Sequence, residues 1–323
     1  MRVMKKILFG HKVSEKHLQK TKEIAPDWNV VISENPEDKL KEIKDADIYV
    51  DWGFNIERRF IEAAEHLRWI QALSAGVDGL AFDLVREKGI IVTTTSGIHK
   101  VPIAELVFGY MLMFARGLTR FYEQQKKKVW DKNVRTAELF EKTLGIVGAG
   151  NIGSEIARLG KAFGMRVLGL NRSGRIQGNS SQMYDEMYGI GSLVELLSKS
   201  DFVVCAVPLT AETRHLFREE HFKAMKSTAY FINIARGAVV DEEALIKALK
   251  EGWIAGAALD VFEKEPLPPE SPLWEMPNVI ITPHIAGSSD RYMERAMKVV
   301  NENLRRYLQG EPLINIVDPE RGY

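Results

Sequence analysis

Residues 143–164, TLGIVGAGNIGSEIARLGKAFG, decide the fold of this chain. The stretch begins as an apolar strand and places Gly148, Gly150 and Gly153 in GxGxxG register at the start of a helix-periodic segment. The first glycine permits a tight turn, the second lets the backbone approach a pyrophosphate, and the third lets helix and strand pack closely. Because a helix N-terminus attracts anions, the stretch predicts a dinucleotide site inside a βαβ unit.

Strand-like apolar runs alternate with helix-periodic segments on both sides of this turn. They lie at 5–10, 29–33, 46–52, 68–74 and 90–95 before it, and at 165–170, 201–208, 229–235, 255–261 and 279–284 after it. Such alternation is typical of parallel sheets covered by helices. We therefore predict an α/β protein with two parallel sheets, one of them beginning at residue 143.

Three helices have signals of their own. Residues 102–128 form a long, mostly apolar pattern that opens with Pro102 in its first turn, and residues 289–310 form an amphipathic pattern that ends at Gly310. Between two of the later strands, Ser192 and Glu195 have the spacing of a capping box. We expect one continuous helix from each of these patterns.

The composition favours a globular protein that handles small molecules. Lysine plus arginine and aspartate plus glutamate number 44 each, so no global field favours nucleic acid or an anionic membrane. The single cysteine, Cys205, excludes an intrachain disulfide and favours a reducing, cytoplasmic compartment. No apolar run has the length of a membrane span or of a signal-peptide core. We expect neither nucleic acid nor a membrane as partner.

The residues after the run 165–170 normally decide between the two nicotinamide cofactors. An acidic side chain there accepts hydrogen bonds from the ribose 2′-hydroxyl of NAD and repels the 2′-phosphate of NADP. This chain has Asn171, Arg172, Ser173 and Arg175 instead, and no acidic residue stands between Gly164 and Tyr184. Two guanidinium groups and a hydroxyl match a phosphate. The sequence favours NADP(H); NAD(H) use, and a merely solvated basic loop, stay open.

Three later strand-like runs end in polar residues suited to chemistry. They lead to Arg236, to Asp260 and Glu265, and to His284. Since ligands bind beyond the carboxyl ends of parallel strands, all three segments should face one crevice. An arginine can hold the carboxylate and ketone oxygens of a 2-oxo acid, a histidine can move the proton on that oxygen, and a carboxylate can orient the imidazole. The set predicts hydride transfer at C2 of such an acid.

Each of these residues also has an ordinary structural interpretation. Arg236 could form an ion pair beside a helix, Glu265 could be a surface charge in a proline-bounded loop, and His284 could be a loop histidine. Their occurrence together at consecutive strand ends favours catalysis.

Several segments form a pattern far more specific than the glycine turn: LSAGVD, IAELV, GIVGAGNIG, VPLTAETRHL, NIARGAVVDEEAL, ALDVFEKEPLP and TPHIAG. With these segments, most of the chain resembles the D-2-hydroxyacid dehydrogenases, a family that includes glyoxylate/hydroxypyruvate reductases and phosphoglycerate dehydrogenases. The resemblance implies two doubly wound parallel-sheet domains with a crevice between them. A flavodoxin-like substrate domain would comprise 1–101 plus 286–323, and a Rossmann dinucleotide-binding domain 102–285.

The resemblance also implies a role for each matched residue. Arg236 would bind the substrate carboxylate and carbonyl, Glu265 would support the histidine, and His284 would be the acid/base. Asp260 would hold the nicotinamide carboxamide. The backbone of Ser74, Ala75 and Gly76 would cradle the substrate carboxylate. Together with the glycine turn and the basic loop described above, the predicted cofactor-binding residues are Gly148, Gly150, Asn151, Ile152, Gly153, Asn171, Arg172, Ser173, Arg175, Pro208, Thr213 and Ala235.

Two features depart from the family pattern. Asn171 replaces the acidic residue usual in NAD-using members, which supports NADP. His99 and Lys100 make the interdomain crossover more basic than expected. One of them could approach a substrate group, and a solvated hinge is an equal alternative.

We therefore predict an oxidoreductase that moves a hydride between NADP(H) and C2 of a small 2-oxo or (R)-2-hydroxy acid, of the glyoxylate/hydroxypyruvate reductase type. Sibling reactions on phosphoglycerate or phosphite, and a dinucleotide sensor like the C-terminal-binding corepressors, remain alternatives. Formate dehydrogenation is less favoured, because those relatives pair the histidine with glutamine. The resemblance also implies a homodimer, and no metal site is expected.

Overall fold

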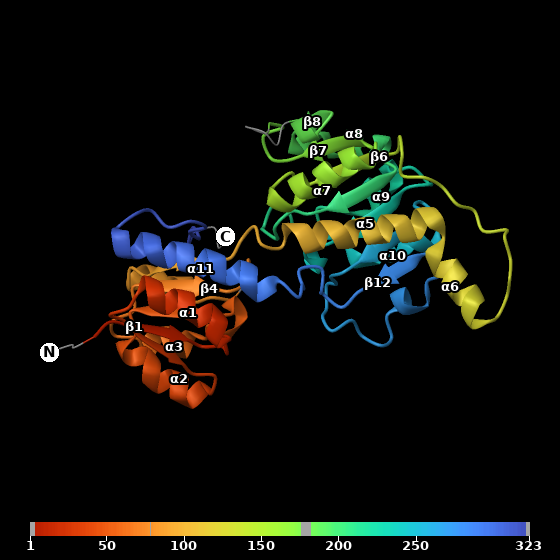
Figure 1. Ribbon diagram of the computed structural model, residues 1–323. Helices are drawn as coiled ribbons and strands as arrows, with labels where there is room; N and C mark the ends of the chain where they lie inside the picture. The colour runs from red at the N-terminus through yellow and green to blue at the C-terminus, as the bar shows by residue number, and fades with distance from the viewer. Residues whose placement is uncertain (1–3, 78, 176–181, 321–323) are drawn as a thin grey trace. The chain divides into compact units, whose positions relative to one another are not determined.

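A computed structural model describes residues 4–77, 79–175 and 182–320. The described chain divides into two compact units, one from Met1–Ile98 with Ser289–Tyr323 and the other from His99–Ser288 (Figure 1). The family resemblance implied crossovers at 101–102 and 285–286. The first unit is thus assembled from both ends of the chain.

The first unit contains, within its described residues, a five-stranded parallel sheet in the order β2-β1-β3-β4-β5. Its elements are β1 (Lys6–Phe9), α1 (Glu15–Ile24), β2 (Asn29–Ile32), α2 (Pro36–Glu42), η1 (Ile43–Asp45), β3 (Ile48–Asp51), η2 (Gly53–Asn55), α3 (Arg58–Ala63), β4 (Trp69–Ala72), α4 (Phe82–Glu87), β5 (Ile91–Thr93) and α11 (Tyr292–Gln309). Helices α1 and α11 pack on one face of the sheet, and α3 and α4 on the other. The order 2-1-3-4-5 is that of flavodoxin-like sheets, as predicted.

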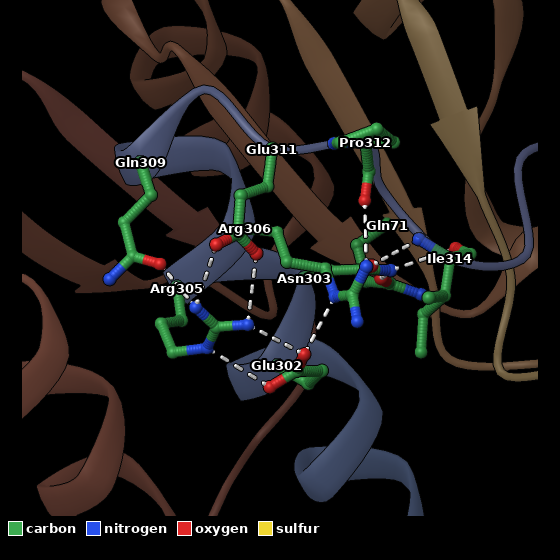
Figure 2. A network of polar contacts seen from close by, with 9 residues as sticks. All are labelled: Gln71, Glu302, Asn303, Arg305, Arg306, Gln309, Glu311, Pro312 and Ile314. Atoms are coloured by element: carbon green, nitrogen blue, oxygen red, sulfur yellow. Dashed lines mark hydrogen bonds and ion pairs between the residues drawn. The ribbon is translucent and has the colours of Figure 1, made fainter.

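Helix α11 joins the C-terminal stretch to the first unit. Its apolar face is buried against β1, β3 and β4. The buried side chain of Asn303 donates to Gln71 Oε1 (2.9 Å) and to the carbonyl of Ile314 (3.1 Å), and accepts from the Ile314 amide (2.8 Å; Figure 2). The helix ends at Gly310, which has a left-handed backbone (φ 70°), so the predicted end is confirmed.

The second unit contains, within its described residues, a seven-stranded parallel sheet in the order β12-β11-β10-β9-β6-β7-β8. Its elements are α5 (Lys100–Arg116), α6 (Leu118–Lys126), β6 (Thr143–Val147), α7 (Asn151–Ala162), β7 (Arg166–Leu170), β8 (Glu186–Tyr188), η4 (Ile190–Ser192), α8 (Leu193–Lys199), β9 (Phe202–Cys205), α9 (Glu219–Ala224), β10 (Tyr230–Asn233), η5 (Gly237–Val239), α10 (Glu242–Lys250), β11 (Gly256–Leu259), η6 (Pro272–Glu275) and β12 (Val279–Ile281). Counted from β6, this is the Rossmann order 3-2-1-4-5-6 extended by β12, as predicted.

Helices cover both faces of this sheet. Helices α5 and α7 pack side by side on one face, and α8, α9 and α10 on the other (Figure 1). The sheet is therefore doubly wound. Cys205 lies in β9, and burial raises the pKa of its thiol to about 12, which fits a packing role.

Two predictions about helices were wrong. The single helix over 102–128 is broken at Gly117, whose left-handed backbone (φ 63°) separates α5 from α6 at a bend of 69°. Ser192 forms no capping box, because it closes the 3-10 helix η4 and its hydroxyl makes no cap hydrogen bond.

Among the described helices, none alone is long and apolar enough to cross a membrane. The pair α5 and α6 passes that test only when the two are taken together, across their bend.

Candidate active site

The glycine turn between β6 and α7 fits a bound dinucleotide. Gly148 has a left-handed backbone (φ 114°), and a Cβ there would lie 2.5 Å from the Ala206 carbonyl. A Cβ on Gly153 would lie 2.3 Å from the Gly148 carbonyl oxygen, so α7 could not pack as closely. At Gly150 nothing lies within 4 Å of the Cβ position, which leaves the backbone open to a pyrophosphate. Asn151 and Ile152 begin α7, whose first amides have no intrahelical acceptor.

A compact turn follows β7, where the second ribose of a dinucleotide would lie. The Asn171 side chain organises it by accepting from the amides of Ser173 (3.1 Å) and Gly174 (2.7 Å) and donating to the Arg175 carbonyl (2.8 Å). Arg172 is exposed and pairs with Glu212 (3.1 Å), a contact that solvent screens. The turn therefore exposes two arginines and no carboxylate of its own.

The loop after β9 contains two of the predicted cofactor residues. The hydroxyl of Thr213 donates to the Pro208 carbonyl at 2.6 Å. The structure thus joins the two ends of this loop through the residues that the family pattern selected.

Arg236, Glu265 and His284 lie in segments that follow three strands at the same edge of the sheet. They follow β10, β11 and β12, which are parallel neighbours whose last residues are in register. The carboxyl ends of parallel strands meet at the same edge, where α/β proteins bind ligands.

His284 and Glu265 form a direct contact. Nδ1 of the imidazole lies 2.7 Å from Glu265 Oε2, and both side chains are partly exposed. The other carboxylate oxygen accepts from the Phe262 amide at 3.0 Å. With one oxygen fixed by backbone and the other facing Nδ1, the imidazole is oriented so that Nε2 is left for a ligand.

Asp260 has structural contacts that the sequence did not reveal. Its buried carboxylate accepts from the Thr282 hydroxyl and from the amides of Ile285 and Ala286, both at 2.9 Å. These bonds hold the segment that contains His284, whose backbone is left-handed (φ 53°). An acidic residue at the end of a buried apolar strand is the signal that could have indicated this role.

Arg236 lies beside His99. The arginine precedes η5 and donates from Nη1 to the Ala235 carbonyl at 2.8 Å. Burial, followed by the Arg236 guanidinium, lowers the pKa of His99 to about 4. The His99 ring also packs on Gly287, where a Cβ would lie 2.8 Å from it. Of the two basic residues at the crossover, His99 therefore lies by the candidate catalytic segments, whereas Lys100 is exposed at the start of α5.

The Ser74–Ala75–Gly76 turn belongs to the first unit and follows β4. The Ser74 hydroxyl donates to the Gly76 carbonyl (2.6 Å) and accepts from the Gly53 amide (3.0 Å). A Cβ on Gly53 would lie 2.5 Å from that carbonyl oxygen, so the segment after β3 braces the turn closely. The turn lies at the carboxyl edge of its own sheet.

A hollow of about 490 Å³ lies at the opposite edge of the second-unit sheet. Its lining includes Asp201, Thr228, Ala255 and Asn278, which precede β9, β10, β11 and β12. It is therefore separate from the strand ends that hold the candidate catalytic residues. Over 4–77, 79–175 and 182–320, no group of three or more His, Cys, Asp and Glu could hold a metal ion.

The chain is similar to known proteins. The family model of the NAD binding domain of D-isomer specific 2-hydroxyacid dehydrogenases matches residues 108–286. Glyoxylate reductase of Korarchaeum cryptofilum is 39% identical over 289 residues, 87% of this chain and 85% of the relative. D-3-phosphoglycerate dehydrogenase of Methanocaldococcus jannaschii is 37% identical over 98% of this chain, which spans only 60% of that relative.

A solved structure agrees with the fold. The D-isomer specific 2-hydroxyacid dehydrogenase of Xanthobacter autotrophicus, in complex with NADPH and MES, superposes with a TM-score of 0.82 at 32% identity and covers 99% of this chain and 100% of its own. The matched domain, the glycine turn and the strand-end residues all indicate a nicotinamide dinucleotide enzyme. The chain belongs to the D-isomer specific 2-hydroxyacid dehydrogenase family.

Proposed function

We propose that this protein uses NADPH to reduce a small 2-oxo acid of the glyoxylate or hydroxypyruvate type to the (R)-2-hydroxy acid. The observation that carries the proposal is the 2.7 Å contact between His284 Nδ1 and Glu265 Oε2 at the carboxyl edge of the sheet. Because Nδ1 is occupied by the carboxylate, Nε2 is the atom that exchanges a proton with the substrate oxygen.

The remaining substrate contacts come from the Arg236 guanidinium and from backbone amides. Arg236 holds the carboxylate and carbonyl of the 2-oxo acid and draws electron density from the carbonyl carbon. The amides of the 74–76 turn hold the carboxylate as well. When bound, the nicotinamide supplies or accepts the hydride at C2. In reduction, His284 gives the oxygen its proton, and Glu265 stabilises the imidazole in its orientation throughout.

The preference for NADPH rests on the turn after β7. Asn171 stands where a carboxylate would select NAD, and its own hydrogen bonds hold the turn that presents Arg172, Ser173 and Arg175. A 2′-phosphate would offer Arg172 a stronger partner than the exposed Glu212 carboxylate. The related Xanthobacter enzyme was solved with NADPH.

A second candidate is the oxidation of 3-phosphoglycerate. The observation that favours it is the Methanocaldococcus relative, whose similarity extends over 98% of this chain. The enzyme assay below includes the corresponding 2-oxo acid, so the two candidates are compared directly.

The test follows the absorbance of NADPH and of NADH with glyoxylate, hydroxypyruvate, pyruvate, phenylpyruvate and 3-phosphohydroxypyruvate. We expect turnover of glyoxylate or hydroxypyruvate with NADPH, and a loss of about 10²- to 10⁴-fold in His284→Ala because the acid/base is removed. Efficient turnover with NADH alone would overturn the cofactor preference. NADPH binding without turnover of any acid would favour a dinucleotide sensor.

We also propose a homodimer formed through α6 and the segment after it. Within the described residues, helix α6 buries no side chain. Large apolar side chains are exposed there, namely Leu118, Phe121, Tyr122, Val129 and Trp130. The cytoplasmic location remains a prediction that rests on the single cysteine.

A further inference from the structure

Glu242, which is not one of the three proposed catalytic residues, holds the loop that contains Glu265. Glu242 is the first residue of α10, and its Oε2 accepts from the Glu263 amide at 3.1 Å. The preceding amide, that of Phe262, donates to Glu265 Oε1 at 3.0 Å. Two successive amides of one loop are therefore fixed by two carboxylates, and the second carboxylate faces His284.

A second histidine–glutamate pair holds the same loop. Nε2 of His215 lies 2.9 Å from Glu263 Oε1. The backbone of His215 is itself bonded to the segment before α10, with its amide donating to the Ala238 carbonyl at 2.8 Å. The loop is thus attached to two neighbouring segments through Glu263, one contact by its amide and one by its side chain.

The segment from Arg236 to Glu242 contacts this loop at two places. A Cβ on Gly237 would lie 1.8 Å from the Phe262 carbonyl carbon, so glycine alone permits the approach. The two segments therefore meet at both ends, at Gly237 beside Arg236 and at Glu242. A shift of Glu242 would therefore also move the segments that contain Arg236 and Glu265.

The position of Glu242 is costly for a carboxylate. Burial raises the pKa of Glu242, the bond from the Glu263 amide opposes that rise, and the nearby Glu263 carboxylate adds to it. Its neighbour Glu243 lies in the same first turn of α10, and its side chain is exposed. What distinguishes Glu242 is the bond to the Glu263 amide.

We propose that Glu242 is a positioning residue: by fixing the Phe262–Glu263 backbone, it holds Glu265 at its distance from His284. The inference rests on the proposed function, because it concerns the same acid/base pair. Glu242 acts through Glu265, because both carboxylates bind successive amides of the same loop. The reach of its acceptor oxygen, and not its charge, is the property that matters.

The experiment compares four variants. Three of them separate the length of the Glu242 side chain, which brings its acceptor oxygen to the Glu263 amide, from its charge. Glu242→Gln keeps the reach and removes the charge, Glu242→Asp keeps the charge and shortens the reach, and Glu242→Ala removes both. Glu243→Ala is the matched control. For each we would measure kcat and KM for glyoxylate at saturating NADPH. We would also record the low-field Nδ1 proton resonance of His284 in ¹⁵N-histidine-labelled protein, assigned by its absence in His284→Asn.

We expect Glu242→Asp and Glu242→Ala to lose about 10- to 100-fold in kcat, the size associated with a misplacement of about 1 Å, with little change in KM. Their His284 Nδ1 resonance should move upfield or broaden, because its bond to Glu265 loosens. Glu242→Gln and Glu243→Ala should match the wild type in both measurements. If Glu242→Ala does not fold, the Asp and Gln variants decide.

Two results would overturn the inference: a Glu242→Asp protein with wild-type kcat and resonance, or equal losses in the Gln and Asp variants. If the wild type reduces no 2-oxo acid, the proposed function fails. The resonance then still decides whether Glu242 controls the Glu265–His284 contact.

Discussion

At the residue scale, His99 couples folding to pH. Burial and the Arg236 guanidinium lower its pKa from 6.5 to about 4, so between these values the unfolded chain binds a proton that the folded chain does not. The resulting stability is present above pH 6.5 and is lost as the pH falls toward 4. Each pH unit in that window is worth at most about 1.4 kcal/mol.

Replacing His99 should therefore flatten the acid side of the stability profile. Between pH 7 and pH 4.5, we expect the free energy of unfolding of His99→Gln to fall by about 2 kcal/mol less than that of the wild type, as measured in urea at both pH values. His66→Gln, at an exposed position, should fall in parallel with the wild type. Parallel curves for His99→Gln and wild type would contradict the assignment.

The sequence indicates residue types better than residue contacts. Arg236, Glu265 and His284 could be selected because each follows an apolar run that had to be a buried parallel strand. The bonds of Asp260 to the segment after His284 could not, because they depend on how two loops fold back at the sheet edge. The proximity of His99 to Arg236 likewise joins residues far apart in the chain.

At the element scale, helix α11 depends on Asn303 more than on its surface ion pairs. Figure 2 shows Asn303 hydrogen-bonded to Gln71 and Ile314, whereas Arg305 faces Glu302 and Glu311. Asn303→Ala would leave the buried amide of Gln71 and both backbone groups of Ile314 without this partner.

We expect Asn303→Ala to lower the free energy of unfolding by about 2–3 kcal/mol, measured by urea denaturation. Arg305→Ala is the control on the same helix. Its loss should be clearly smaller, because Arg305 is partly exposed and solvent screens its ion pairs. Equal losses in the two variants would show that the surface network holds the helix.

Helices and strands with an unambiguous sequence pattern could be predicted. Those whose pattern fits two kinds of structure, or fits none clearly, could not. Every apolar run assigned to a strand contains one, because a short apolar run bounded by turn residues is the signal that predicts a strand, even for the partly exposed edge strands β2 and β12. The short edge strand β8, EMY, lacks that property and was not predicted. Gly117 was ambiguous because a glycine inside a helical pattern either stays helical or ends the helix, and the local sequence does not decide.

At the scale of the whole molecule, each of the two units has its own set of candidate residues. The first contributes the backbone turn at 74–76, and the second contributes Arg236, Glu265, His284 and the glycine turn. Both sets lie at the carboxyl edges of their own parallel sheets. The strand orders differ between the two sheets, although both are parallel and covered by helices on both faces.

Helix α6 and the segment after it lead to a prediction about assembly. The side chains of Tyr122 and Trp130 are 59% and 91% exposed, and the helix has no buried residue in the chain by itself. An amphipathic helix that leaves such side chains in water is stabilised when a second copy covers them, since burial of apolar area stabilises association.

We expect light scattering after size exclusion to give twice the chain mass of 36.6 kDa. Leu118→Glu combined with Tyr122→Glu should shift the mass toward one chain, whereas Phe54→Glu, which changes an exposed side chain in the first unit, should leave it unchanged. A wild-type mass of one chain across micromolar concentrations would refute the dimer.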